Sequence, residues 1–143
     1  MKLVIVAAVL LAGTGIVACG GDDAGDPAGA PVIEVKLRNW AVEPAVASAP
    51  SGKVTFRAVH EKEEHGHGDG GGLVHELAVS KKNADGSADL IATTGELGVG
   101  EQKDLTLTLE PGEYELQCNL VETVGGKAVG HYPQGMHTAF KVT

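Results

Sequence analysis

Short stretches of alternating apolar and polar residues recur along most of this chain. In the clearest stretch, Ile33, Val35 and Leu37 alternate with charged residues, so that one face would be buried and the other solvated. A period of two residues is typical of a β-strand that covers a core with one of its faces. The same period recurs further along the chain, at residues 54–58, 73–79, 105–109, 114–118 and 136–142.

Turn signals separate these stretches, and no segment has a convincing helical period. Pro50-Ser51-Gly52 and Pro111-Gly112 are combinations that favour turns, as is the segment from Asn83 to Gly86. A chain of 143 residues allows one domain. Several short strands with turns between them predict an all-β fold, and we expect an antiparallel β-sandwich.

The same alternation places three potential metal ligands on inward faces. His75 shares a face with Leu77 and Val79, Cys118 follows Tyr114 and Leu116, and Met136 precedes Phe140 and Val142. Side chains two residues apart on a strand point to the same side, so the three donors are expected to face one interior. An inward histidine by itself is more often a core residue, but sulfur and imidazole donors together suit a copper site.

A second imidazole is available at two positions near Met136. His131 lies five residues before Met136, and His137 directly follows it. Neighbouring residues on a strand point to opposite sides, so an inward Met136 turns His137 outward. This favours His131 as the second imidazole ligand and leaves His137 as the alternative.

The order His75, Cys118, His131, Met136 resembles that of the cupredoxins, the blue copper proteins that include plastocyanin and azurin. The resemblance covers residues 32–143. It implies a Greek-key β-sandwich that binds copper through His75, Cys118 and His131, with Met136 as a long axial ligand. It further implies one-electron transfer, cycling Cu(I) and Cu(II), to a protein redox partner, and no enzymatic activity.

The chain departs from plastocyanin and azurin between the cysteine and the second histidine, where those proteins have only a few residues. Here residues 119–130 intervene, and Gly125, Gly126 and Gly130 lead us to expect a flexible excursion. The neighbour of the first histidine, Glu76, is expected to be a solvated edge residue.

An insertion before His75 contains further imidazoles. His60, His65 and His67 lie among carboxylates and glycines, which predicts either an exposed, flexible second metal site or a solvated acidic loop. The insertion also suggests an alternative function, that of an envelope protein that binds or delivers copper.

The N-terminus resembles an export signal. Residues 1–18 have a basic start and an apolar core that is short for a membrane span, which needs ~20 residues. Ile16-Val17-Ala18-Cys19 resembles a bacterial lipobox, which implies a lipid on Cys19 and a membrane anchor on the extracytoplasmic side, periplasmic or at the cell surface. Residues 19–31 are acidic and rich in Gly and Pro, and we interpret them as a flexible linker to a domain at 32–143.

Charge and cysteine content narrow the functional classes. The formal net charge of -8 excludes the basic surface that nucleic-acid binding requires. The chain has only two cysteines, so lipidation of Cys19 would leave Cys118 unpaired in an oxidising compartment, which supports a ligand role for Cys118.

Overall fold

The computed structural model describes residues 29–62 and 73–143. The expected export signal, Cys19, most of the linker, His65 and His67 lie outside the described residues. The strands are β1 (Val32–Arg38), β2 (Ala41–Pro44), β3 (Ser48–Ala49), β4 (Gly52–His60), β5 (Ala78–Lys82), β6 (Ala88–Thr93), β7 (Gln102–Leu109), β8 (Gly112–Gln117), β9 (Val121–Val124), β10 (Lys127–Gly130) and β11 (His137–Val142). A 3-10 turn, η1 (Tyr132–Gln134), precedes β11. The expectation of an all-β fold is confirmed for this part of the chain, within which no helix is long and apolar enough to cross a membrane.

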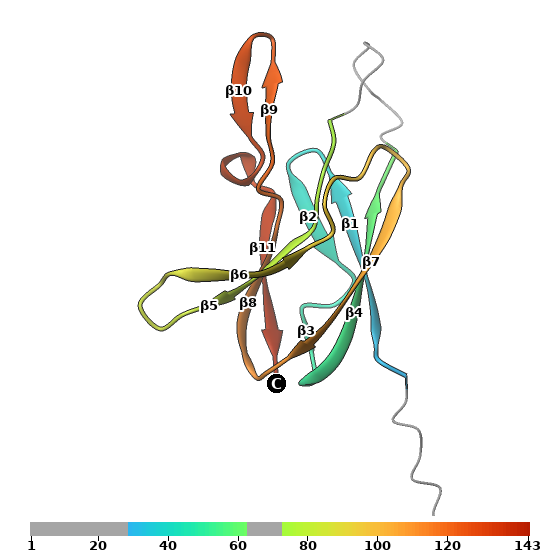
Figure 1. Ribbon diagram of the computed structural model, residues 1–143, viewed down its shortest axis with the longest axis vertical. Coiled ribbons are helices and arrows are strands. Elements are labelled where there is room, and N and C mark those ends of the chain that lie inside the picture. The colour runs from blue at the N-terminus through green and yellow to red at the C-terminus, as the bar shows by residue number, and fades with distance from the viewer. Residues whose placement is uncertain (1–28, 63–72) are drawn as a thin grey trace, which may run out of the picture.

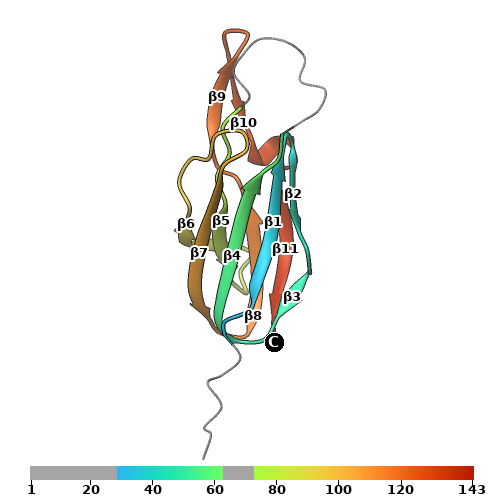
Figure 2. The same cartoon turned by 90° about the vertical axis from the view of Figure 1, so that its right-hand side faces the viewer.

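Two sheets face each other across the core. One has the strand order β2-β1-β4-β7 and the other β3-β11-β8-β5-β6, while β9 and β10 form a separate hairpin. Figure 1 shows this hairpin projecting beyond one end of the two sheets, and Figure 2 shows the first sheet lying in front of the second. The ring of Phe56 on β4 meets that of Phe140 on β11 edge to face, with centroids 5.2 Å apart. Apolar side chains from both sheets thus form one core.

The expectation of a purely antiparallel arrangement is wrong. Strand β1 pairs with β4 in parallel, and β3 pairs with β11 in parallel. After β2 the chain leaves the first sheet, and β3 joins the second before β4 returns to the first. Parallel neighbours require a long connection, which residues 39–51 provide between β1 and β4. An alternating pattern specifies the buried face of a strand but not the direction of its neighbour.

The segment around His75 is less regular than its alternation predicts. Strand β5 begins only at Ala78, and His75 forms an isolated antiparallel bridge with Leu97. The two residues exchange backbone hydrogen bonds, with N–O distances of 3.1 and 2.6 Å. His75 therefore lies in a connecting segment that passes over the end of the core.

The expected flexible excursion between Cys118 and His131 is instead an antiparallel hairpin. Strands β9 and β10 are paired in register, with Val121 opposite Gly130 at one end and Val124 opposite Lys127 at the other. The turn between them has φ angles of 58° at Gly125 and 77° at Gly126. Two successive positive φ angles are what a tight type I′ hairpin turn needs, and glycine adopts them without steric cost.

The contribution of the core can be tested with two matched truncations. Leu116 on β8 is fully buried between β5 and β11, whereas Leu90 on β6 is 58% exposed. Leu116→Ala should lower the free energy of unfolding by about 2–5 kcal/mol. Leu90→Ala should change it by no more than about 0.5 kcal/mol. Urea unfolding of both variants measures the difference, and equal losses would contradict this description of the core.

Candidate metal centre

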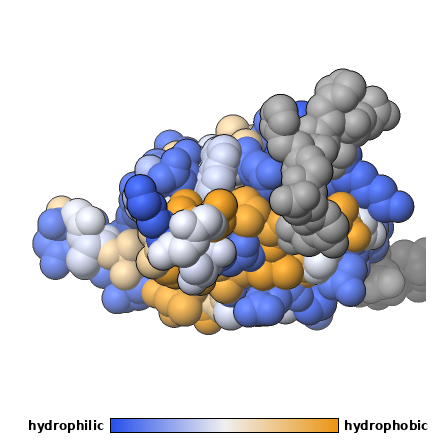
Figure 3. All heavy atoms as spheres, turned by 90° about the horizontal axis from the view of Figure 1, so that it is seen from above, coloured by the Kyte–Doolittle hydropathy of each residue, from blue (hydrophilic) through white to orange (hydrophobic). Residues whose placement is uncertain are grey.

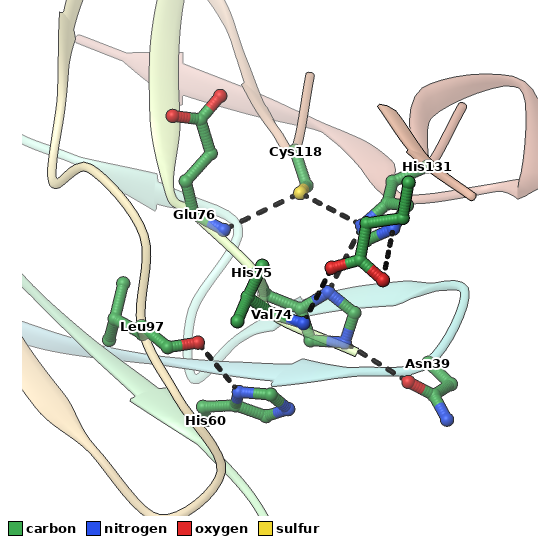
Figure 4. A network of polar contacts seen from close by, with 9 residues as sticks. Asn39, His60, Val74, His75, Glu76, Leu97, Cys118 and His131 are labelled. Atoms are coloured by element: carbon green, nitrogen blue, oxygen red, sulfur yellow. Dashed lines mark hydrogen bonds and ion pairs between the residues drawn. The ribbon is translucent and has the colours of Figure 1, made fainter. Parts of the chain in front are cut away.

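Three ligand-forming side chains from separate parts of the chain meet in one buried space. His75 comes from the segment before β5, Cys118 directly follows β8, and His131 directly follows β10. None of the three has measurable solvent exposure. Their potential ligand atoms all lie within 4.8 Å of one another, and Figure 4 shows them turned toward a common point.

The separations of the donor atoms fit a single bound ion. Nδ1 of His75 lies 3.2 Å from Nδ1 of His131, and Sγ of Cys118 lies 3.4 Å from the same His131 nitrogen. Imidazole nitrogens bind Zn²⁺, for example, at about 2.0–2.1 Å and thiolates at about 2.3 Å, so donors up to about 4 Å apart can share one ion. The three side chains are therefore close enough to bind a metal ion.

Backbone hydrogen bonds fix the loop that carries His131 and Met136. The N–H of Cys118 donates to the carbonyl oxygen of Met136 at 2.9 Å, and the N–H of Met136 donates to that of His131 at 3.2 Å. Gly135 has a φ of 115°, and a Cβ there would come within 3.1 Å of the backbone oxygen of Trp40. This tight turn places Met136 beside Cys118 in the backbone, with the methionine side chain fully buried.

A polar partner orients the ring of His75. Its Nε2 lies 3.2 Å from Oδ1 of Asn39. An amide oxygen only accepts hydrogen bonds, so Nε2 carries the proton and Nδ1 keeps its lone pair. The hydrogen bond therefore leaves available the nitrogen that faces the other two donors, as an outer partner does for a metal-binding histidine.

Glu76 supports the sulfur of Cys118. Its backbone N–H donates to Sγ at 3.4 Å. Its carboxylate accepts hydrogen bonds from the hydroxyl of Thr93 at 2.7 Å and from the backbone N–H of Asn119 at 3.3 Å. Glu76 is partly exposed, and its hydrogen bonds join the segment of His75 to that of Cys118.

Burial determines the protonation of the three donors. Loss of solvent, together with the nearby rings of His60 and His131, lowers the pKa of His75 to about 3. Burial also lowers the pKa of His131 and raises the pKa of the Cys118 thiol. In the metal-free protein at neutral pH, both imidazoles are neutral and ready to bind, whereas an ion must displace the proton of the thiol.

His60 belongs to the surroundings of this site and not to an exposed loop. Its side chain is 3% exposed, and its Nδ1 lies 3.0 Å from the backbone oxygen of Leu97. The centroid of its ring lies 4.4 Å from that of His75. The expectation of an exposed donor is therefore wrong for His60, which packs against a potential ligand.

The structure separates the two candidates for the second imidazole. His131 lies in the cluster, whereas His137 on β11 has a side chain that is 43% exposed. Nδ1 of His137 lies 3.3 Å from a carboxylate oxygen of Glu115, and its ring stacks on Tyr132 with centroids 4.4 Å apart. His137 thus contacts Glu115 and Tyr132 and lies outside the cluster of donors.

Three residues that lie beside the site were not predicted from the sequence: Asn39, Trp40 and Glu122. Trp40, the only tryptophan of the chain, touches the ring of His131 edge-on with centroids 5.6 Å apart and is 38% exposed. Its φ of 68° is unusual for a residue with a side chain. Asn39 and Trp40 directly follow the first alternating stretch, but nothing in the alternation connects them to His131.

A comparison with models of known protein families found none that matches this chain, and a search of curated proteins found no match. The function is therefore inferred from the chemistry of the site itself.

Burial of His75 predicts a pH dependence of stability in the metal-free protein. Between its unfolded pKa of ~6.5 and its folded pKa of about 3, the unfolded chain binds a proton that the folded chain does not. The free energy of unfolding should therefore fall as pH is lowered through this window, by on the order of a few kcal/mol from this group.

His75→Gln isolates that contribution, because the carboxylates titrate alike in both proteins. Urea unfolding in the presence of a chelator, at pH values between 7 and 3, should show a shallower loss in the variant than in the wild type. The same pH dependence in both proteins would contradict the assignment.

Proposed function

We propose that this protein is a blue-copper electron-transfer protein of the cell envelope, with a cupredoxin-type Greek-key sandwich as its fold. The ligands would be His75, Cys118 and His131, with Met136 as the long axial ligand. The observation that carries the proposal is the buried convergence of two imidazole nitrogens and one thiol sulfur. Two histidines and one cysteine with a weak axial methionine are the ligand set of blue-copper electron-transfer sites.

The chemistry of the donors favours copper over zinc. Structural zinc sites are usually completed by cysteine, histidine or carboxylate ligands. Here the buried residue that is hydrogen-bonded through its backbone to both Cys118 and His131 is Met136, a thioether. Soft sulfur ligands select Cu(I), while imidazole suits both copper oxidation states.

The surrounding residues hold the donors in place before any ion binds. Asn39 orients His75, the N–H of Glu76 lies against the sulfur of Cys118, and the backbone of Met136 connects Cys118 to His131. Bound copper would supply the one-electron couple. A ligand set that is already fixed reorganises little when charge changes, and hydrogen bonds to the sulfur tune the potential.

The arrangement of the two sheets supports the proposed fold. The chain crosses from one sheet to the other between β2 and β3, between β3 and β4, between β4 and β5, between β6 and β7, and between β7 and β8. Cross-connections of this kind are typical of Greek-key sandwiches.

Trp40 offers a contact between the buried ligands and a redox partner. The four proposed ligands have no measurable exposure, whereas the half-exposed ring of Trp40 touches that of His131. Hydrophobic residues gather across the end of the molecule that carries the β9–β10 hairpin (Figure 3). Since the net charge is -8, we expect a neutral or basic protein partner at this end.

Copper loading tests the proposed function. The oxidised, copper-loaded protein should show an intense thiolate-to-copper absorption band in the visible, and Cys118→Ser should abolish it. Met136→Leu should keep the colour and shift the reduction potential upward, because the axial bond is weak. A band that survives Cys118→Ser would contradict the proposal. Tight Cu(I) binding with transfer to an acceptor and no reversible redox wave would instead favour copper delivery.

We also propose that Cys19 carries the lipid that anchors the protein to the membrane. The support is the sequence Ile16-Val17-Ala18-Cys19 and the acidic, glycine-rich segment that follows it. The intact mass of the mature protein should exceed that of the chain from Cys19 by acyl groups, and Cys19→Ala should release the protein from membranes. An unmodified mature protein free in the extracytoplasmic fluid would refute this anchor.

A further inference from the structure

The hairpin between Cys118 and His131 turns one carboxylate toward the metal centre. Along β9, Val121, Thr123 and Val124 are exposed, while Glu122 is half-buried, with 20% of its side chain exposed. Glu122 pairs with Val129 on β10, so the hairpin holds its backbone in place.

The carboxylate of Glu122 reaches the segments of both histidines. Oε1 accepts a hydrogen bond from the backbone N–H of Val74, the residue before His75, at 2.7 Å. Oε2 lies 3.9 Å from Nε2 of His131. Both Val74 and His131 are labelled in Figure 4.

Nε2 of His131 is a buried polar atom without a hydrogen-bond partner. Within residues 29–62 and 73–143, it is the buried side-chain nitrogen or oxygen for which no such partner is found. When Nδ1 of a neutral histidine binds an ion, the proton is on Nε2. A buried N–H without an acceptor is destabilising, and the carboxylate oxygen that lies 3.9 Å from Nε2 is that of Glu122.

We propose that Glu122 is a positioning residue of the metal centre, which accepts a hydrogen bond from Nε2–H of His131 when Nδ1 of His131 binds the ion. The result is a carboxylate–histidine–metal arrangement, which fixes the orientation of the ring and makes the imidazole a more basic ligand. The proposal goes beyond the function proposed above. The effect of Glu122 on the reduction potential rests on that function, whereas the positioning of His131 applies to any bound ion.

The two imidazoles then differ in their outer partners. His75 donates to the neutral amide oxygen of Asn39, whereas His131 faces a carboxylate. A negative charge beside His131 stabilises the more positive oxidation state of a bound ion. The hairpin therefore gives this site a lower reduction potential than the same ligands would have without Glu122.

Zinc affinity tests the positioning of His131 without any redox chemistry. Glu122→Gln removes the charge and keeps an oxygen that can accept from the N–H of Val74. Competition with a chelator should show Zn²⁺ binding that is about 10–100-fold weaker in this variant. Glu115→Gln is the matched control, because it removes a buried carboxylate beside His137, and it should change the affinity by no more than about twofold. Unchanged affinity in Glu122→Gln, or an equal loss in both variants, would overturn the proposal.

The imidazole proton offers a test that needs no variant. In ¹H–¹⁵N spectra of the zinc-loaded wild type, Nε2–H of His131 should appear as a slowly exchanging, downfield resonance, as expected of a hydrogen bond to a carboxylate. A rapidly exchanging or unshifted Nε2–H would overturn the proposal, even if Glu122→Gln did not fold.

The copper-loaded protein tests the effect on the potential. If Glu122→Gln weakens Cu(II) binding tenfold more than Cu(I) binding, the reduction potential rises by about 59 mV. An unchanged or lower reduction potential in Glu122→Gln would overturn the proposed effect of Glu122 on the potential. Absence of the thiolate–copper band in the wild type would instead refute the proposed function, and the zinc and proton measurements would still decide the role of Glu122.

Discussion

Two imidazole nitrogens and one sulfur face each other in the buried interior, with His131 Nδ1 only 3.2 and 3.4 Å from the other two donors. Burying polar atoms costs free energy unless partners compensate for the lost water. The protein keeps both imidazoles neutral, with the pKa of His75 lowered to about 3. It supplies hydrogen bonds from outside the cluster, through Asn39 to His75 and through the N–H of Glu76 to the sulfur. Among the described residues, the buried side-chain atom left without a hydrogen-bond partner is Nε2 of His131.

The topology of the two sheets brings these partners to one end of the molecule. Cys118 directly follows strand β8, and His131 directly follows the β9–β10 hairpin. His75 is held in place by its backbone bridge with Leu97. The turn after β1 supplies both Asn39 and Trp40, and the end of β4 supplies His60, which packs against His75. The site thus depends on connections between the strands that form the core.

The β9–β10 hairpin is the part of the fold that brings a carboxylate to the metal centre. It covers the imidazole of His131 and presents a carboxylate to the nitrogen that faces away from the donors. His131 is fully buried, whereas Trp40, whose ring touches that of His131, is 38% exposed.

The alternation of residues by itself determined most strands that carry the core, because a period of two decides which side of a strand is buried. It also anticipated the burial of His75 and Met136, although both lie just outside the strands. The opposite faces of Met136 and His137 likewise favoured His131 as the second imidazole. Only the tertiary structure decided that β1 and β4 run parallel, that residues 119–130 form a hairpin, and that His60, Asn39, Trp40 and Glu122 surround the ligands. These contacts join residues that are distant in sequence and depend on strand direction and connection paths. A local pattern carries no information about such long-range packing, because it reports only the burial of each side chain.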